Sequence, residues 1–349
     1  MSTPTVSLIV PCCNERPFLG PFLDAVLAQA HAHGACEVLI ADGASSDGSR
    51  ALLDARAATT PLLRIIDNPQ RIVSTGLNAA LAQAQGAVIV RLDMHTTYAP
   101  DYLAQCLAVL GETGAANVGG PWVARGTTPM SCAIAAAFQS PFAVGGARSH
   151  DATWEGPVDS VYLGCWPRHV FAEVGAFDAG LVRNQDDEHN FRLRQAGMLV
   201  WQSPRIRSWY QPRSSLRALW RQWHQYGYWK VAVGRKHHRP TSLRQLVPAA
   251  FLSTLALLLL AGLLWPTVRP LGMALLALYV AGVCTASVLT ARLSGWRLLL
   301  RLPAVFACFH LGYGAGFLRG VWDFLLRRRH PASVMARLTR PSHPSGGGA

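Results

Sequence analysis

The chain has 349 residues, 50% of them hydrophobic, with a formal net charge of +13. This composition excludes a chain made only of one soluble core and indicates additional apolar segments. The excess charge is mostly arginine near those segments and accompanies no nucleic-acid motif, so we expect no nucleic-acid partner. The eight cysteines include no Cys-x-x-Cys pair, which is typical of a reduced protein facing the cytosol.

Residues 1 to about 205 alternate short apolar runs with helix-like stretches. The runs VSLIVP, EVLIAD, LLRIID and AVIVRLD predict strands, with helices near 17–32, 47–58 and 74–84. This rhythm is typical of βαβ units, so we predict an α/β domain with a mostly parallel central sheet. The first run follows no basic residue and meets Pro11, Asn14 and Glu15 at once, which indicates a strand and not a signal peptide.

Polar groups follow three of these runs, where ligands bind in such sheets. Asn14 and Glu15 end the first, Asp42 the second, and Asp93 and His95 the fourth. Side chains two residues apart in a strand point the same way, so we expect Asp93 and His95 to contact one ligand together. A helix cap or turn residue is the alternative at each single position.

The C-terminal part holds the longest apolar segments. Segments 247–265 and 271–289 each contain 19 residues without a formal charge, enough to cross about 30 Å of hydrocarbon as helices. The preceding stretch, SSLRALWRQWHQYGYWKVAVGRKHHR, combines aromatic and cationic residues and suits a helix at the headgroup level, or else an ordinary amphipathic linker.

A third apolar segment, 302–318, has 17 residues and carries His310. We expect Gly312, Gly314, Gly316 and Gly320 to weaken it, and predict that it is re-entrant or interfacial, with both termini in the cytosol. Three full crossings remain the alternative. The expected organisation is 1–210 as the first domain, 211–245 as interfacial helix or linker, 246–330 as membrane domain, and 331–349 as a disordered tail.

Four stretches together resemble the successive signatures of family 2 glycosyltransferases. They are VSLIVPCCNE, EVLIADGASSDGS, GLNAALAQAQGAVIVRLDMH and GAFDAGLVRNQDDEHNFRLRQAG, and they cover nearly all of the first 200 residues. RLDMHTTYAPDYL and NQDDEHNFRLRQAG, with a C-terminal membrane segment, are most similar to the branch that builds succinoglycan and related bacterial exopolysaccharides. The resemblance implies a GT-A-like nucleotide-sugar-binding domain followed by a helical membrane domain.

The resemblance also implies site residues. The nucleotide sugar, expected to be a UDP-sugar, would be bound by a set of six residues: Pro11, Asn14, Glu15, Asp42, Asn78 and Asp93. The family's Asp-x-Asp motif, which holds a divalent ion on the diphosphate, is here Asp93-Met94-His95, so Asp93 and His95 are the expected metal ligands. Because imidazole suits Mn²⁺ at least as well as Mg²⁺, the metal identity stays open.

The cluster Asp186-Asp187-Glu188 would contain the catalytic base. Counting back from the frame Arg192 to Gly197 assigns Asp186, with Asp187 as the runner-up. A base of this kind takes the proton of the acceptor hydroxyl in an inverting transfer. Acids at a helix start are also favoured by the helix dipole alone, which would explain two of the three without function.

The acceptor and diphosphate contacts are implied more loosely. Gly119, Gly120, Gly164 and Trp166 lie where the family forms its acceptor wall. The family's Gln-x-x-Arg-Trp motif is not present as such, and Arg221, Gln222 and Trp223 in RALWRQWHQYG are the nearest equivalent.

These features predict a membrane-anchored, metal-dependent, inverting glycosyltransferase with its catalytic domain on the cytoplasmic side of the inner or plasma membrane. It would move a hexose from a nucleotide diphosphate sugar to a lipid-linked saccharide. The alternatives are a polyprenyl-phosphate glycosyltransferase and a membrane scaffold that has lost activity, although Asp93 and Asp186 are both present.

Overall fold

The computed structural model describes residues 5–240, 242–328, 331 and 335, so most of the tail predicted over 331–349 lies outside the described residues. The described chain forms two units. The first comprises residues 5–123 and 148–211, and the second comprises residues 124–147 and those from 212 onward. Segment 124–147, expected within the first domain, therefore belongs to the second unit.

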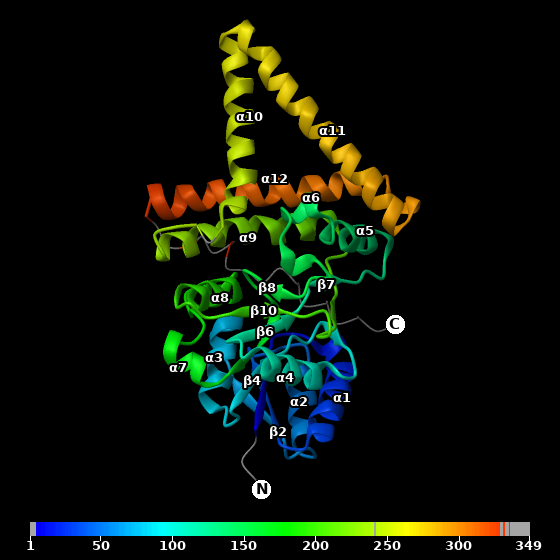
Figure 1. Cartoon of the computed structure of the whole chain (residues 1–349), viewed down its shortest axis with the longest axis vertical. Helices are drawn as coiled ribbons and strands as arrows, with labels where there is room; N and C mark the ends of the chain where they lie inside the picture. The colour runs from blue at the N-terminus through cyan, green and yellow to red at the C-terminus, as the bar shows by residue number, and fades with distance from the viewer. Residues whose placement is uncertain (1–4, 241, 329–330, 332–334, 336–349) are drawn as a thin grey trace. The chain divides into compact units, whose positions relative to one another are not determined.

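The first unit begins with the predicted alternation of strands and helices (Figure 1). All four predicted strands and three predicted helices are present, as β1 (Val6–Cys12), α1 (Arg16–His33), β2 (Cys36–Asp42), α2 (Ser49–Ala57), β3 (Leu63–Asp67), α3 (Val73–Gln83) and β4 (Val88–Arg91). Each strand pairs in parallel with its neighbours in the order β3-β2-β1-β4. Leu8, Ile9 and Val10 are at most 2% exposed, because the sheet is apolar on both faces.

The sheet continues beyond β4 with four more strands. The remaining elements of this unit are β5 (Thr96–Tyr98), α4 (Tyr102–Thr113), β6 (Asn117–Gly120), η1 (Arg148–His150), β8 (Gly156–Pro157), β9 (Tyr162–Pro167), α7 (His169–Val174), α8 (Gln185–Gln195), β10 (Val200–Gln202) and β11 (Ser208–Tyr210), with β7 (Val123–Ala124) at the unit boundary. The full order is β3-β2-β1-β4-β9-β6-β10-β8. Because β9 runs antiparallel to both β4 and β6, the sheet is mixed but mostly parallel, as predicted.

The second unit is helical. Its elements are α5 (Pro129–Phe138), α6 (Pro141–Val144), α9 (Leu216–Lys236), η2 (Leu243–Leu246), α10 (Val247–Leu264), η3 (Pro266–Val268), α11 (Arg269–Ser294), η4 (Trp296–Leu298), α12 (Leu302–Gly320) and a π-helical turn η5 (Val321–Leu326). Phe138 of α5 packs on Phe309 of α12 and Trp223 of α9, with ring centroids 5.4 and 5.9 Å apart, which explains why this segment belongs here.

Three helices among the described residues are long and apolar enough to cross a membrane: Leu243–Leu264, Pro266–Ser294 and Leu302–Leu326. The third is longer than the 17-residue segment expected from the sequence, because helical structure continues through η5. Helix α12 is unbroken through Gly312, Gly314 and Gly316.

Candidate active site

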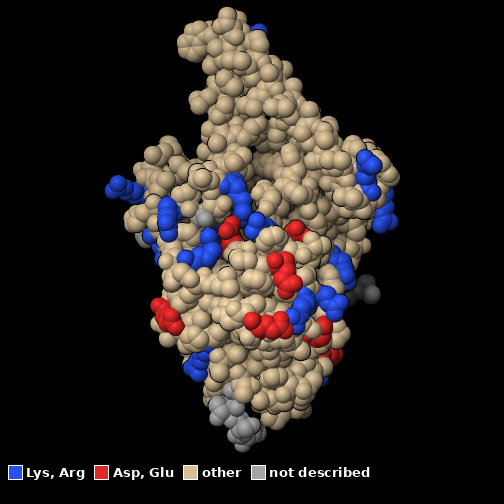
Figure 2. Space-filling model, in the orientation of Figure 1, with Lys and Arg blue, Asp and Glu red and all other residues tan. Residues whose placement is uncertain are grey.

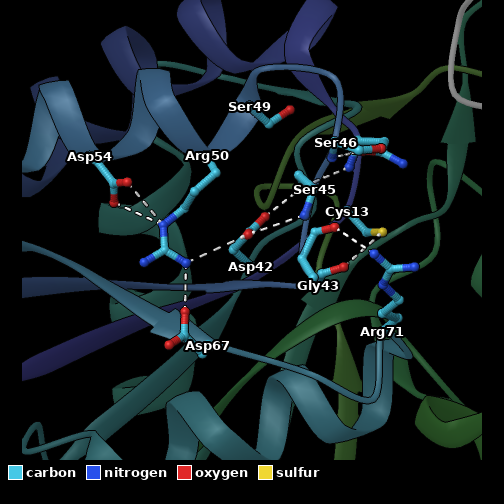
Figure 3. A network of polar contacts seen from close by, with 12 residues as sticks. Cys13, Asp42, Gly43, Ser45, Ser46, Ser49, Arg50, Asp54, Asp67 and Arg71 are labelled. Atoms are coloured by element: carbon cyan, nitrogen blue, oxygen red, sulfur yellow. Dashed lines mark hydrogen bonds and ion pairs between the residues drawn. The ribbon is translucent and has the colours of Figure 1, made fainter.

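The ends of β1 and β2 are joined by a network of hydrogen bonds (Figure 3). Asp42 is 1% exposed and accepts bonds from the backbone N–H and hydroxyl of Ser45, at 3.2 and 2.6 Å. The Ser45 hydroxyl in turn accepts the backbone N–H of Asn14 at 2.8 Å. The two positions predicted at separate strand ends therefore share one serine.

Asn14 closes this network from the β1 side. Its backbone lies in the left-handed region, with φ 56°, a conformation that asparagine tolerates better than most residues. Its side-chain oxygen accepts the backbone N–H of Ser46 at 2.7 Å. Pro11 lies just before it in β1, beside Ala41 of β2. The polar turn after β2 is thus held rigidly against the end of β1.

Arg50 adds a cation beside Asp42 that the sequence interpretation did not include. Its guanidinium lies 3.8 Å from the Asp42 carboxylate and also pairs with Asp54 and Asp67. The bonds to Asp67 and Asp54 raise the pKa of Arg50 above its ordinary value. Figure 3 shows these three carboxylates converging on the one arginine.

Asp93 and His95 do not lie in a strand, so strand alternation does not align their side chains, and their action on one ligand stays a prediction. Strand β4 ends at Arg91, and Met94 and His95 form a turn before β5. The two side chains have different partners. Nδ1 of His95 lies 3.5 Å from Oε1 of Glu15, and its ring meets the edge of Tyr210 with centroids 5.9 Å apart.

Asp93 pairs instead with Arg91, the last residue of β4. Nη2 of Arg91 lies 3.3 Å from Oδ1 of Asp93, and its Nη1 lies 3.6 Å from Oδ2 of Asp186. Arg91 is only 5% exposed. Burial opposes its charge, but Asp93 and Asp186 favour it, and the pKa of the guanidinium stays above its ordinary value. One buried cation therefore joins the proposed metal and base aspartates.

The three acids at the start of α8 have different environments. Glu188 is fully buried and pairs with Arg192 at 3.0 Å, and Arg192 also donates to the carbonyl of Ala176 at 2.6 Å. Glu188 therefore has a structural role. Asp186 is 33% exposed at its side chain and faces Arg91, while its Oδ1 accepts the backbone N–H of Asp187 at 2.9 Å. The contact of Asp186 with the buried Arg91, which also pairs with Asp93, favours Asp186 as the base.

Two residues predicted at the acceptor wall, Gly164 and Trp166, are buried. Trp166 is 1% exposed and belongs to the core, where it meets the edges of Phe177 and His189. A Cβ on Gly164, whose φ is +135°, would overlap the Trp166 ring. Both residues therefore contribute to core packing, and their contact with an acceptor stays a prediction. The space beside Gly119 is likewise occupied by Val161, and the space beside Gly120 by the backbone of Ile206.

Asn78 also has internal partners. Its amide nitrogen donates to the carbonyl of Phe177 at 2.7 Å, and its oxygen accepts the Phe177 N–H at 3.0 Å. This pair of bonds anchors the segment that precedes α8 to α3. The contribution of Asn78 to a nucleotide site would therefore be to position that segment.

Arg221, Gln222 and Trp223 lie on α9 of the second unit. Arg221 is exposed, whereas Gln222 is 3% exposed and donates to the hydroxyl of Tyr226 at 3.0 Å. The Trp223 ring packs 4.3 Å from that of Phe309. Gln222 and Trp223 thus stabilise the helical unit itself.

The described residues contain no group of three His, Cys, Asp or Glu side chains that could hold a metal ion by themselves. Asp93 and His95 remain the candidates, as one carboxylate and one imidazole near each other in the chain. Such a donor set fits a cation that takes its other ligands from substrate phosphates, as Mg²⁺ commonly does.

Comparisons with known proteins agree on one family. Residues 7–152 match the family model "Glycosyl transferase family 2". The chain is 31% identical to the succinoglycan biosynthesis protein ExoA of Rhizobium meliloti, over 94% of this chain and 98% of that protein. It is 24% identical to the dolichyl N-acetyl-alpha-D-glucosaminyl phosphate 3-beta-D-2,3-diacetamido-2,3-dideoxy-beta-D-glucuronosyltransferase of Methanococcus voltae, over 90% and 97%.

The fold has a solved counterpart. The mannosyltransferase PcManGT from Pyrobaculum calidifontis, in complex with GDP-Man and Mn²⁺, superposes with a TM-score of 0.56 at 21% identity, covering 92% of this chain and 88% of that one. The expected GT-A architecture is thereby confirmed. With the full-length similarity to the succinoglycan protein, these matches establish that the chain belongs to glycosyltransferase family 2.

Proposed function

We propose that this glycosyltransferase is an inverting, membrane-anchored enzyme that moves a hexose from a nucleotide diphosphate sugar to a lipid-linked saccharide. The observation that carries the proposal is the buried Arg91, 3.3 Å from Asp93 and 3.6 Å from Asp186. It brings the residue expected at the nucleotide diphosphate and the residue expected at the acceptor hydroxyl to the same cation. That is the arrangement a direct transfer between two bound substrates needs.

In the proposed reaction, the Asp186 carboxylate takes the proton from the acceptor hydroxyl as that oxygen bonds to the anomeric carbon. The bond from this carbon to the diphosphate breaks, and the nucleotide diphosphate leaves from the opposite face. Asn14 and Asp42, held together through Ser45, would bind the base and ribose of the donor. Arg91, which pairs with both aspartates, would hold their carboxylates in position.

A divalent cation, Mg²⁺ or Mn²⁺, would be held by Asp93 and His95 and would neutralise the charge of the diphosphate. The Mn²⁺ in the complex of the Pyrobaculum calidifontis enzyme is consistent with this. That enzyme is bound to GDP-Man, so we keep the donor as a nucleotide diphosphate sugar and treat a UDP-sugar as one candidate among others.

The proposed acceptor is a saccharide on a polyprenyl-type lipid. The Methanococcus voltae relative is named for a dolichyl phosphate that already carries N-acetylglucosamine, which supports a lipid-linked sugar over a bare lipid phosphate. The three apolar helices would hold the enzyme at the membrane where such acceptors reside, with catalysis on the cytoplasmic side.

The test is a panel of UDP-, GDP- and other nucleotide-linked hexoses, incubated with membranes that contain the full chain and with a lipid extract of the source cells. We expect one donor to release nucleotide only when lipid is present, and Asp186→Asn membranes to release none. A product with one sugar on a lipid monophosphate would favour the polyprenyl-phosphate alternative. No release from any donor would contradict the proposed transfer.

A further inference from the structure

Helices α9 and α12 lie side by side and run parallel in the second unit (Figure 1). Their backbones touch through glycines on both helices. A Cβ on Gly316 would overlap the carbonyl oxygen of His224, and one on Gly227 would overlap that of Tyr313. At Gly320 the added atom would lie 2.7 Å from the carbonyl oxygen of Tyr228. The backbones of the two helices are therefore in close contact at several successive turns.

Polar contacts add to this packing at the C-terminal end of α12 and in η5. Asp323, which is 5% exposed, accepts the hydroxyl of Tyr228 at 3.2 Å and pairs with Arg319 at 3.0 Å. Arg235 of α9 donates to the carbonyl of Phe324 at 3.1 Å. Because these contacts span the whole pair, α12 cannot move into a bilayer without α9.

Helix α9 is unsuited to hydrocarbon. It carries five cations, namely Arg217, Arg221, Lys230, Arg235 and Lys236. Arg221 lies five residues after the start of the helix and Lys230 six residues before its end, so both would enter the apolar layer if the helix crossed a bilayer. A crossing by α12 would thus force at least these two cations into the apolar layer.

Helices α10 and α11 have the opposite character. Their most apolar windows are only 11% and 22% buried, against 44% for α12. The surface of this hairpin is almost free of charge in Figure 2. Exposed leucines cover it on several sides, for example Leu257 and Leu260 of α10 and Leu278 of α11. Such helices need lipid around them.

We propose that only the α10–α11 hairpin crosses the membrane, while α9 and α12 lie together in the headgroup layer of an anionic leaflet. Arg244, Arg297 and Arg301 lie at the two feet of the hairpin, and only Arg269 lies at its tip, a distribution that places the feet on the cytoplasmic side. Trp322, 44% exposed with Arg327 over its ring at 4.6 Å, suits the same interface. The inference rests on the membrane anchoring in the proposed function, but not on the transfer reaction.

The test places single cysteines in the full chain, in a background without native cysteines, and labels them with a membrane-impermeant maleimide. Leu300→Cys and Leu326→Cys flank α12 and are 92% and 67% exposed, and Thr267→Cys lies at the hairpin tip. We expect the first two to react only in inside-out vesicles and the third only on intact spheroplasts. Labelling of Leu300→Cys and Leu326→Cys from opposite sides would overturn the inference.

Two further measurements separate the possible failures. Release of the chain from membranes by alkaline carbonate would overturn this inference together with the proposed anchoring, whereas the nucleotide-release assay reports transfer independently. Should the cysteine-free chain not fold, the same three cysteines are placed in the native background and the labelled peptides are identified by mass spectrometry. The same pattern of sidedness is then expected.

Discussion

Nη1 of Arg91 lies 3.6 Å from Oδ2 of Asp186, although the two residues come from the end of β4 and the start of α8. Arg91 is buried and also pairs with Asp93, so its charge is shared by two carboxylates. A cation in this position organises both halves of the proposed site.

Arg91→Met should lower kcat by about 100-fold with a smaller change in the donor KM, because the two aspartates lose the group that orients them. Leaving Asp93 and Asp186 without their counter-charge should also lower stability, by roughly 3 kcal/mol. Arg91→Lys keeps the charge but not the forked geometry, so it should recover part of kcat. Steady-state kinetics and thermal unfolding of the three proteins measure this, and wild-type kcat in Arg91→Met would contradict the role.

Asp186→Asn should lower transfer by about 10²–10⁴-fold while donor binding is kept, because only the proton acceptor is removed. Asp187→Asn is the matched control, one residue along the same helix turn, and should keep most activity. Donor binding and single-turnover transfer are the measurements. An inactive Asp187→Asn together with an active Asp186→Asn would identify Asp187 as the base.

Chelation should abolish activity, and Mn²⁺ or Mg²⁺ should restore it. His95→Ala should raise the metal concentration needed for half-maximal rate, because the imidazole 3.5 Å from Glu15 is a proposed ligand. The exposed His169, on α7, provides a control substitution to Ala that should change nothing. Metal titrations of the three proteins decide this, and full activity in EDTA would exclude the cation from the reaction.

The first four strands could be predicted because each is a short apolar run followed by turn residues, a local signal. Strand β9 could not be predicted in this way, because its place between β4 and β6 depends on long-range pairing. The roles of the three acids of α8 could not be told apart from the sequence either. They share one helix start, and only burial in the folded structure distinguishes Glu188 from Asp186.

Arg91 left one overlooked signal in the sequence, a positive charge within the apolar run AVIVRLD. A charge in a buried strand needs a partner, so it points to nearby acids. The contact of His95 with Glu15 left no signal in the sequence, because residues 80 positions apart meet only through the fold. The packing role of the α12 glycines could not be predicted either, because glycine weakens an isolated helix but permits close approach of two packed ones.

The pH dependence of stability should include a contribution from His189. Its ring is fully buried between Phe171 and Phe177, and burial lowers its pKa from the ordinary 6.5 to about 3. Between these values the unfolded chain binds a proton that the folded chain does not, so stability falls as pH falls below 6.5, by up to about 1.4 kcal/mol per unit.

His189→Phe should therefore flatten the loss of stability between pH 6.5 and 4, since phenylalanine fills the aromatic site without titrating. Thermal unfolding at several pH values compares it with the wild type. His169→Phe, at a residue whose side chain is 71% exposed, is the control and should keep the wild-type slope. An unchanged slope in His189→Phe would assign the acid sensitivity to other groups.

The packing of α9 on α12 should depend on Gly316. A valine there would place its Cβ against the carbonyl oxygen of His224. Because the Cβ is fixed to a helical Cα and the oxygen belongs to a helical backbone, neither can move aside alone. Gly316→Val should thus separate the helices locally and cost at least the 1–3 kcal/mol that is roughly typical of overpacking. Ala304→Val introduces the same β-branched side chain at an exposed position of the same helix and should change stability by about 0.5 kcal/mol or less. The midpoints of thermal unfolding of the full chain in detergent compare the two. Equal midpoints would mean that α12 does not need its close contact with α9, and the helix would then be free to cross the membrane without it.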